Sequence, residues 1–152
     1  MSRRSAHTVA MIGLVLSIAG CGGPFDSSAE GVVTLDGVTL PSGWVTFYPS
    51  AGGPSAYGRI DESGSYFMQT GSSTGLPAGE YQVTVIANEP PKELRSKDGG
   101  PPPAGKQLTP AWYCTKEKSG LTVSVKPGSN TLNLELNTKP PAGWNAGGQR
   151  RT

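Results

Sequence analysis

Between residues 30 and 136 the chain is a succession of short runs in which apolar and polar side chains alternate, and each run ends in turn-forming residues. A period of two places the apolar side chains on one face of a half-buried β-strand. The runs are GVVTLDG (31–37), GWVTFYP (43–49), SAYGRI (55–60), SYFMQT (65–70), GEYQVTVIA (79–87), SGLTVSV (119–125) and TLNLEL (131–136). Without a convincing helical segment, these runs predict an all-β chain that folds as a single antiparallel β-sandwich of about seven strands.

The residues between the runs support this prediction. Gly (22) and Pro (14) make up close to a quarter of the 152 residues, and both weaken the interior of a helix. Asp36-Gly37 is a two-residue hairpin signal, and DESG (61–64) predicts a turn in which Gly64 takes a positive φ. KPGSN (126–130) predicts a Pro-Gly turn.

Alternation also assigns side chains to the two faces of each strand. In strand 43–49, Val45 and Phe47 are expected on one face, with Trp44 and Tyr48 on the other. The other expected core positions are Val33, Leu35, Tyr81, Val83, Val85, Leu121, Val123, Val125, Leu132, Leu134 and Leu136.

The N-terminus predicts an export signal. Arg3 and Arg4 precede an apolar run at 9–19, and small residues lead to Cys21. This is the layout of a secretory signal, and the run is too short to span a bilayer, which takes about 20 residues. The residues Ile-Ala-Gly-Cys at 18–21 resemble the bacterial lipobox. The resemblance implies cleavage before Cys21, a diacylglyceryl group on its sulfur, and acylation, for example with palmitate, of the new N-terminus.

We therefore expect a signal peptide at 1–20 and a lipidated, flexible tether at 21–29. An ordinary signal peptide with a coincidental cysteine is the alternative. Gly22, not Asp, follows the cysteine, so retention in the inner membrane by that signal is not indicated. The expected location is the cell envelope, at the outer membrane or periplasmic face in preference to the inner membrane.

Cleavage before Cys21 changes which chemistry the chain can perform. It leaves 132 residues with 11 basic and 11 acidic side chains, and it removes His7, the only histidine. Without histidine, Ser-His-Asp catalysis, Cys-His catalysis and the usual His-containing metal sites are excluded. A nearly neutral chain also lacks the basic patch that nucleic acids require. We expect no enzyme activity, no cofactor, no metal site and no nucleic-acid partner.

Four stretches resemble a known family. GVVTLDGVTLPSGWVTFYP, IDESGSYFM and LPAGEYQVTV are similar to the carboxypeptidase regulatory-like, transthyretin-like sandwich domain. LTPAWYCTKEKSGLTVSVKPGSNTLNLEL resembles the end of that domain in small planctomycete-type lipoproteins. The resemblance covers most of 30–137 and implies a transthyretin-like or Ig-like sandwich domain there. Its motifs are turn and core residues, so they imply a fold and no particular activity.

Several side chains are candidates for function. Trp44, Trp112 and Tyr113 are possible ligand-contact residues, which together with Tyr48 and Tyr57 could form an aromatic platform for a glycan. The alternative is that such aromatic residues fill or cap the core. Cys114 is expected to be a buried or partly buried thiol, since no histidine could activate it, although it could instead pair between two chains.

Two segments lack strand patterning. The stretch 88–110 predicts a long loop within the domain, either a solvent-exposed insertion or a partner-binding loop. Residues 138–152 predict a disordered tail.

Three functions remain to be compared. The leading hypothesis is a non-catalytic, membrane-anchored envelope lipoprotein that acts as a structural, accessory or protein-binding module, with an unknown envelope protein or polysaccharide as its partner. The alternative is a carbohydrate-binding surface module. A transthyretin-like hydrolase is less favoured, because the hydrolases that the family resemblance suggests depend on histidines.

Overall fold

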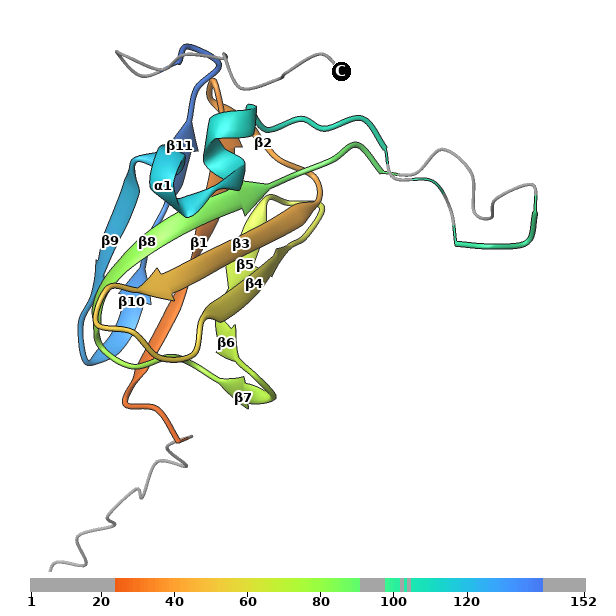
Figure 1. Ribbon diagram of the computed structural model, residues 1–152. Helices are drawn as coiled ribbons and strands as arrows, with labels where there is room; N and C mark the ends of the chain where they lie inside the picture. Colours follow the sequence, from red (N-terminus) through yellow and green to blue (C-terminus); the bar gives the residue numbers. More distant parts are fainter. Residues whose placement is uncertain (1–23, 91–97, 102, 104, 141–152) are drawn as a thin grey trace, which may run out of the picture.

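The computed structural model describes residues 24–90, 98–101, 103 and 105–140, which form two packed β-sheets (Figure 1). The first sheet contains β1 (Ser27–Leu35), β2 (Val38–Thr39), β5 (Ser65–Phe67), β10 (Gly128–Thr131) and β11 (Leu134–Leu136). The second contains β3 (Gly43–Pro49), β4 (Ala56–Ile60), β6 (Gln69–Thr70), β7 (Ser73–Thr74), β8 (Gly79–Ile86) and β9 (Leu121–Val125), in the order β7-β6-β4-β3-β8-β9. The predicted all-β sandwich is confirmed.

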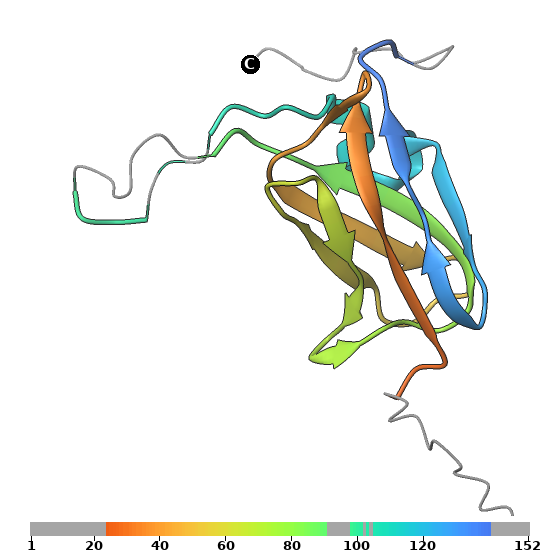
Figure 2. The ribbon, with the colours of Figure 1, turned by 180° about the vertical axis from the view of Figure 1, so that it is seen from behind.

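The first sheet is built around β1, and its pairing is mixed. β10 and β11 run parallel to β1 and lie along one side of it, as Figure 2 shows from behind. β5 and β2 pair with β1 in antiparallel fashion. The predicted turn at 126–130 is shorter than expected, because Gly128, Ser129 and Asn130 already belong to β10. The second sheet is antiparallel throughout.

The expected strand at 65–70 divides between the two sheets. β5 pairs with β1, whereas β6 pairs with β4. Met68 lies at the change of sheet, where its backbone N–H donates to the Ala29 carbonyl at 2.9 Å. This crossing segment closes one side of the sandwich. The turn before it has the predicted form, with Gly64 at φ 83°.

The domain begins earlier than the sequence indicated. β1 starts at Ser27, and Ala29 is fully buried, so the last three residues of the predicted tether belong to the sheet. The Asp36-Gly37 hairpin is confirmed, with positive φ at both residues, as a type I′ turn requires. The predicted signal peptide and Cys21 lie outside the described residues, as does most of the predicted tail.

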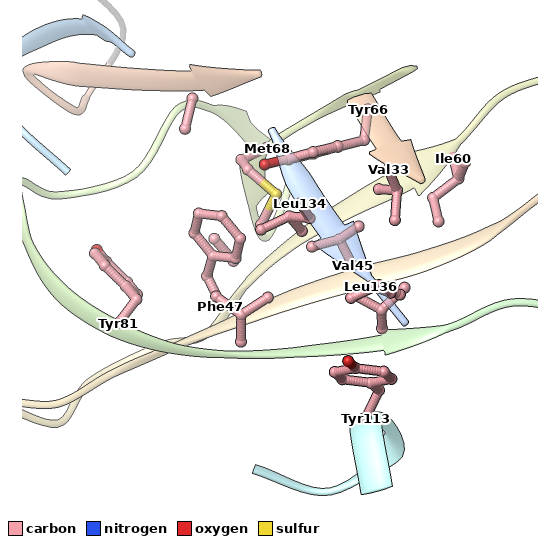
Figure 3. Close-up of a cluster of buried hydrophobic side chains, with 14 of the residues drawn as sticks. Val33, Val45, Phe47, Ile60, Tyr66, Met68, Tyr81, Tyr113, Leu134 and Leu136 are labelled. Carbon is pink, nitrogen blue, oxygen red and sulfur yellow. The ribbon is translucent and has the colours of Figure 1, made fainter. Parts of the chain in front are cut away.

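The core lies between the sheets and uses the predicted faces (Figure 3). Val45, Phe47, Val83 and Val85 are fully buried. Phe47 also packs against Tyr66 and Tyr81, with ring centroids 6.3 Å and 5.8 Å apart. The largest buried side chains beyond these are Val33, Ile60, Met68 and Leu76.

Two single-turn helices depart from the expectation of strands alone. η1 (Ala111–Cys114) and α1 (Lys116–Ser119) lie against β8, beyond the point where β9 begins. The Cys114 thiol donates to the Val85 carbonyl at 3.9 Å, and the Ala87 backbone N–H donates to the Thr109 hydroxyl at 3.1 Å. The helices and the chain before them thereby cover an otherwise unpaired strand edge. None of the helices in the described ranges has the length and apolar character needed to cross a membrane.

Candidate ligand-binding surface

The outer face of the second sheet gathers aromatic and polar side chains from neighbouring strands. Pairing of β3 with β4 places Trp44 directly opposite Arg59, and pairing of β4 with β6 places Tyr57 opposite Gln69. Residues directly opposite on one face have Cβ atoms about 4.5–5.5 Å apart. The inward neighbours Val45 and Ile60 are buried, so the strand alternation itself turns Trp44 and Arg59 outward.

These side chains line a hollow of about 590 Å³, here named the outer-face hollow. Its lining residues are Trp44, Tyr57, Arg59, Phe67, Gln69 and Gly71. Exposed fractions are 54% for Trp44, 49% for Tyr57 and 38% for Phe67. Three large aromatic side chains so exposed within one hollow offer a ligand apolar ring faces beside hydrogen-bonding groups.

Gly58 explains how Phe67 comes to lie in this hollow. A Cβ atom at Gly58 would meet the Met68 sulfur at 2.8 Å and the Phe67 carbonyl oxygen at 3.1 Å. Only glycine therefore lets the crossing segment approach β4 so closely. Because Tyr66 and Met68 point into the core, Phe67 between them is turned outward.

The predicted contact residues separate into two places. Trp44 is exposed in the outer-face hollow, but Trp112 and Tyr113 are only 8% and 5% exposed and belong to the hydrophobic core. Figure 3 shows Tyr113 on its helical turn near Leu136. Both residues border a different recess, of about 240 Å³, at the α1 end of β9. The structure thus does not join them to Trp44, and a ligand-contact role for them with Trp44 is not supported.

The two remaining tyrosines of the expected platform differ as well. Tyr57 is in the outer-face hollow, whereas Tyr48 is half-buried with the Lys116 ammonium 5.7 Å from its ring centroid. Sequence reasoning missed Arg59, Phe67 and Gln69. Their alternation with buried residues indicates that they point outward. Which outward residues are neighbours, however, depends on the strand order, which the sequence pattern does not give.

The turn at 61–64 is held together by hydrogen bonds to the Asp61 carboxylate. The Asp61 carboxylate accepts from the backbone N–H groups of Ser63 and Ser65 at 2.8 Å and 3.0 Å, and from the Ser63 hydroxyl at 2.6 Å. The Ser63 hydroxyl is the main cause that lowers the pKa of Asp61. Among the described residues, no three His, Cys, Asp or Glu side chains gather as a metal site would require.

Cys114 is partly buried, as expected. Burial is the main cause that raises the pKa of its thiol, opposed by hydrogen bonds from Thr109 and Gln107. The Gln107 amide donates to the sulfur at 3.2 Å. A raised pKa keeps the thiol protonated and makes it a poor nucleophile.

The base of the predicted loop 88–110 is more regular than expected. Asn88 and Gln107 form an antiparallel bridge, and the Glu89 backbone N–H donates to the Lys106 carbonyl at 2.7 Å. A second hollow, of about 430 Å³, lies between this base and the β1–β2 hairpin. Its lining is mainly apolar and includes the acidic residues Glu62 and Glu89.

The comparisons with known proteins add no relative to this description. No family model matches the chain, and no match to it is found among the curated proteins or the solved structures.

Proposed function

We propose that the chain is a non-catalytic envelope lipoprotein, held at the membrane by lipid on Cys21, and that it binds carbohydrate through the outer-face hollow. The observation that carries the proposal is the exposure of Trp44, Tyr57 and Phe67 around one hollow. Aromatic faces of this kind stack on the apolar face of a sugar ring, while Arg59 and Gln69 can bond its hydroxyl groups.

Carbohydrate fits this surface better than a protein partner does. From β3 to β6 the hollow spans two inter-strand spacings, about 10 Å. A stable protein interface occupies about 800 Å² on each partner, with its apolar anchors in a larger desolvated patch. On this face the exposed apolar side chains, which include Ile86 opposite Trp44, stand beside Arg59 and Gln69, a mixture that suits a ligand with both apolar faces and hydroxyl groups.

The membrane anchor is supported by the sequence and by where the fold begins. β1 starts six residues after Cys21, and a fully extended chain of that length spans at most about 20 Å. A lipid on Cys21 would therefore hold the start of β1 near the membrane surface. The proposed location is the outer membrane or periplasmic face of the envelope.

The binding role is tested with the mature chain and immobilised envelope polysaccharide. Trp44→Ala is expected to weaken binding by about tenfold or more, since the indole is the largest and most exposed aromatic side chain of the hollow. Val38→Ala is the matched control, because Val38 is 70% exposed and lies outside the outer-face hollow. No binding by the wild-type chain, or equal binding by the Trp44→Ala variant, would contradict the proposal.

The anchor is tested separately with Cys21→Ser. This change is expected to abolish incorporation of labelled palmitate and to move the chain out of the membrane fraction. Unchanged labelling would show that Cys21 is not the lipid site.

A further inference from the structure

Arg59 is the one cationic side chain among the residues that line the outer-face hollow. It is exposed and lies directly opposite Trp44. Within the described residues, the single ion pair is Lys116–Glu117 and the single cation–π contact is Lys116 over Tyr48. The Arg59 guanidinium is therefore engaged by neither interaction and remains available to a ligand.

The surroundings of Arg59 favour an anion. No carboxylate belongs to the described lining of the hollow. Two acidic residues lie next to it: Asp61, which directly follows β4 and whose carboxylate is already bonded within its own turn, and Glu30, which is the cross-strand partner of Phe67 and not of Arg59. A guanidinium has five N–H donors in a planar fork, which matches the two oxygens of a carboxylate or a sulfate.

The position of Arg59 beside the aromatic rings specifies the ligand further. Trp44 is its cross-strand neighbour, and Tyr57 is two residues away on the same face of β4, about 7 Å along the strand. A sugar ring stacked on either aromatic residue would hold a substituent within reach of the guanidinium. Gln69, opposite Tyr57, supplies both a donor and an acceptor for hydroxyl groups.

We infer that the outer-face hollow selects acidic polysaccharides, with Arg59 binding the carboxylate or sulfate of a sugar that stacks on Trp44 or Tyr57. This inference rests on the proposed function, because it takes for granted that the hollow binds carbohydrate. It adds the chemical class of the ligand and the residue that selects it.

The test measures binding of the mature chain to three polymers: polygalacturonate, which carries carboxylates, dextran sulfate, and neutral dextran. The wild-type chain is expected to bind at least one acidic polymer about tenfold more tightly than dextran, with an affinity that falls as salt rises from 0.01 M to 0.15 M. Binding to one acidic polymer alone identifies its anionic group as the one recognised.

The matched variants separate specific from general charge effects. Arg59→Gln is expected to lose about tenfold in affinity for the acidic polymer, while Arg59→Lys retains part of it because the charge is kept and the fork is lost. Lys118→Gln removes the same charge at an exposed position on α1, outside the hollow, and is expected to bind as the wild type does. Circular dichroism melts confirm that each variant is folded.

The inference would be overturned by either of two results. One is equal affinity of the wild-type chain for acidic and neutral polymers, and another is unchanged affinity in Arg59→Gln. If Trp44→Ala alone loses binding, the proposed function stands and the acidic selectivity is wrong. If the wild-type chain binds no polymer but captures an envelope protein, both are wrong.

Discussion

The Tyr66 hydroxyl donates a hydrogen bond to the backbone carbonyl of Leu132, 66 positions later in the chain. The bond joins β5 to the two residues that separate β10 from β11. Around it, the Leu132 N–H donates to the Glu30 carbonyl at 2.7 Å, and the Val32 N–H donates to the Asn133 side chain at 3.0 Å. The backbone groups between β10 and β11 therefore remain hydrogen-bonded, although the regular pairing with β1 is interrupted there.

Tyr66→Phe is expected to destabilise the domain. The change leaves the partly buried Leu132 carbonyl without its hydroxyl donor, which costs about 0.5–1.5 kcal/mol in the free energy of unfolding. Urea unfolding of the two proteins measures the difference. Tyr57→Phe is the control, because Tyr57 is half exposed and lies on the outer face of the second sheet. An unchanged midpoint for Tyr66→Phe would show that the bond contributes nothing.

Stability is expected to fall at alkaline pH. Burial raises the pKa of Tyr66 far above its ordinary value of 10.0, and burial, with a smaller effect from the Asp26 charge, raises the pKa of Tyr81. Above about pH 10 the unfolded tyrosines lose their protons while the folded ones keep them, so the unfolded state is favoured. This contribution is fully present below pH 10 and is lost as pH rises. Thermal melts from pH 8 to 11 should show the decline, and a shallower decline in Tyr66→Phe. A melting temperature constant over this range would contradict the prediction.

Gly58→Ala is expected to cost about 1–3 kcal/mol of stability, because the new methyl group forces the buried Met68 side chain and the crossing segment to move. Since that segment carries Phe67, carbohydrate binding through the outer-face hollow should weaken as well. Urea unfolding and polymer binding measure the two effects. If Gly58→Ala matches the wild type in both, the close approach of the crossing segment is not required.

Val83→Asp is expected to unfold the domain. Val83 is fully buried between the sheets, where an unpaired carboxylate cannot be solvated. The adjacent Gln82→Asp places the same charge on the exposed face of β8 and should stay folded. Circular dichroism and size-exclusion chromatography distinguish the two. A soluble and folded Val83→Asp protein would contradict the face assignment.

Alkylation should be slow at Cys114. Since burial raises the pKa of its thiol, less thiolate is present at pH 7.5 than for a free cysteine. In a Cys21→Ser chain, iodoacetamide should react more slowly with the folded protein than with the protein in urea. The same sample should run as a monomer on a non-reducing gel. Equal rates in the two states, or a dimer band, would contradict this prediction.

Alternation along single strands was enough to predict the class of fold and most of the core. It placed Val45 and Phe47 inward and Trp44 outward, because a strand exposes alternate residues whatever its neighbours are. Strand order depends on pairing between distant segments, and local pattern carries no such information. The parallel pairing of β10 with β1 and the change of sheet at Met68 were therefore not foreseen.

The contrast between local pattern and long-range pairing also explains which residues of the candidate site could be predicted. Trp44 was identified because it is a large aromatic residue on an outward face. Trp112 and Tyr113 have similar chemistry, but they lie on a helical turn that covers the edge of β8, and packing there buries them. Arg59 was missed because its relation to Trp44 exists only through the register of β3 and β4.

The central position of β1 determines how the domain would bear force. If a lipid on Cys21 held the chain while a ligand held the outer sheet face, tension would enter the domain at the start of β1. The hydrogen bonds of β1 to β10, β11 and β5 lie across the strand and would be loaded together, in shear. Bonds that are loaded together must break together, so β1 would resist extraction better than a strand whose bonds open one after another.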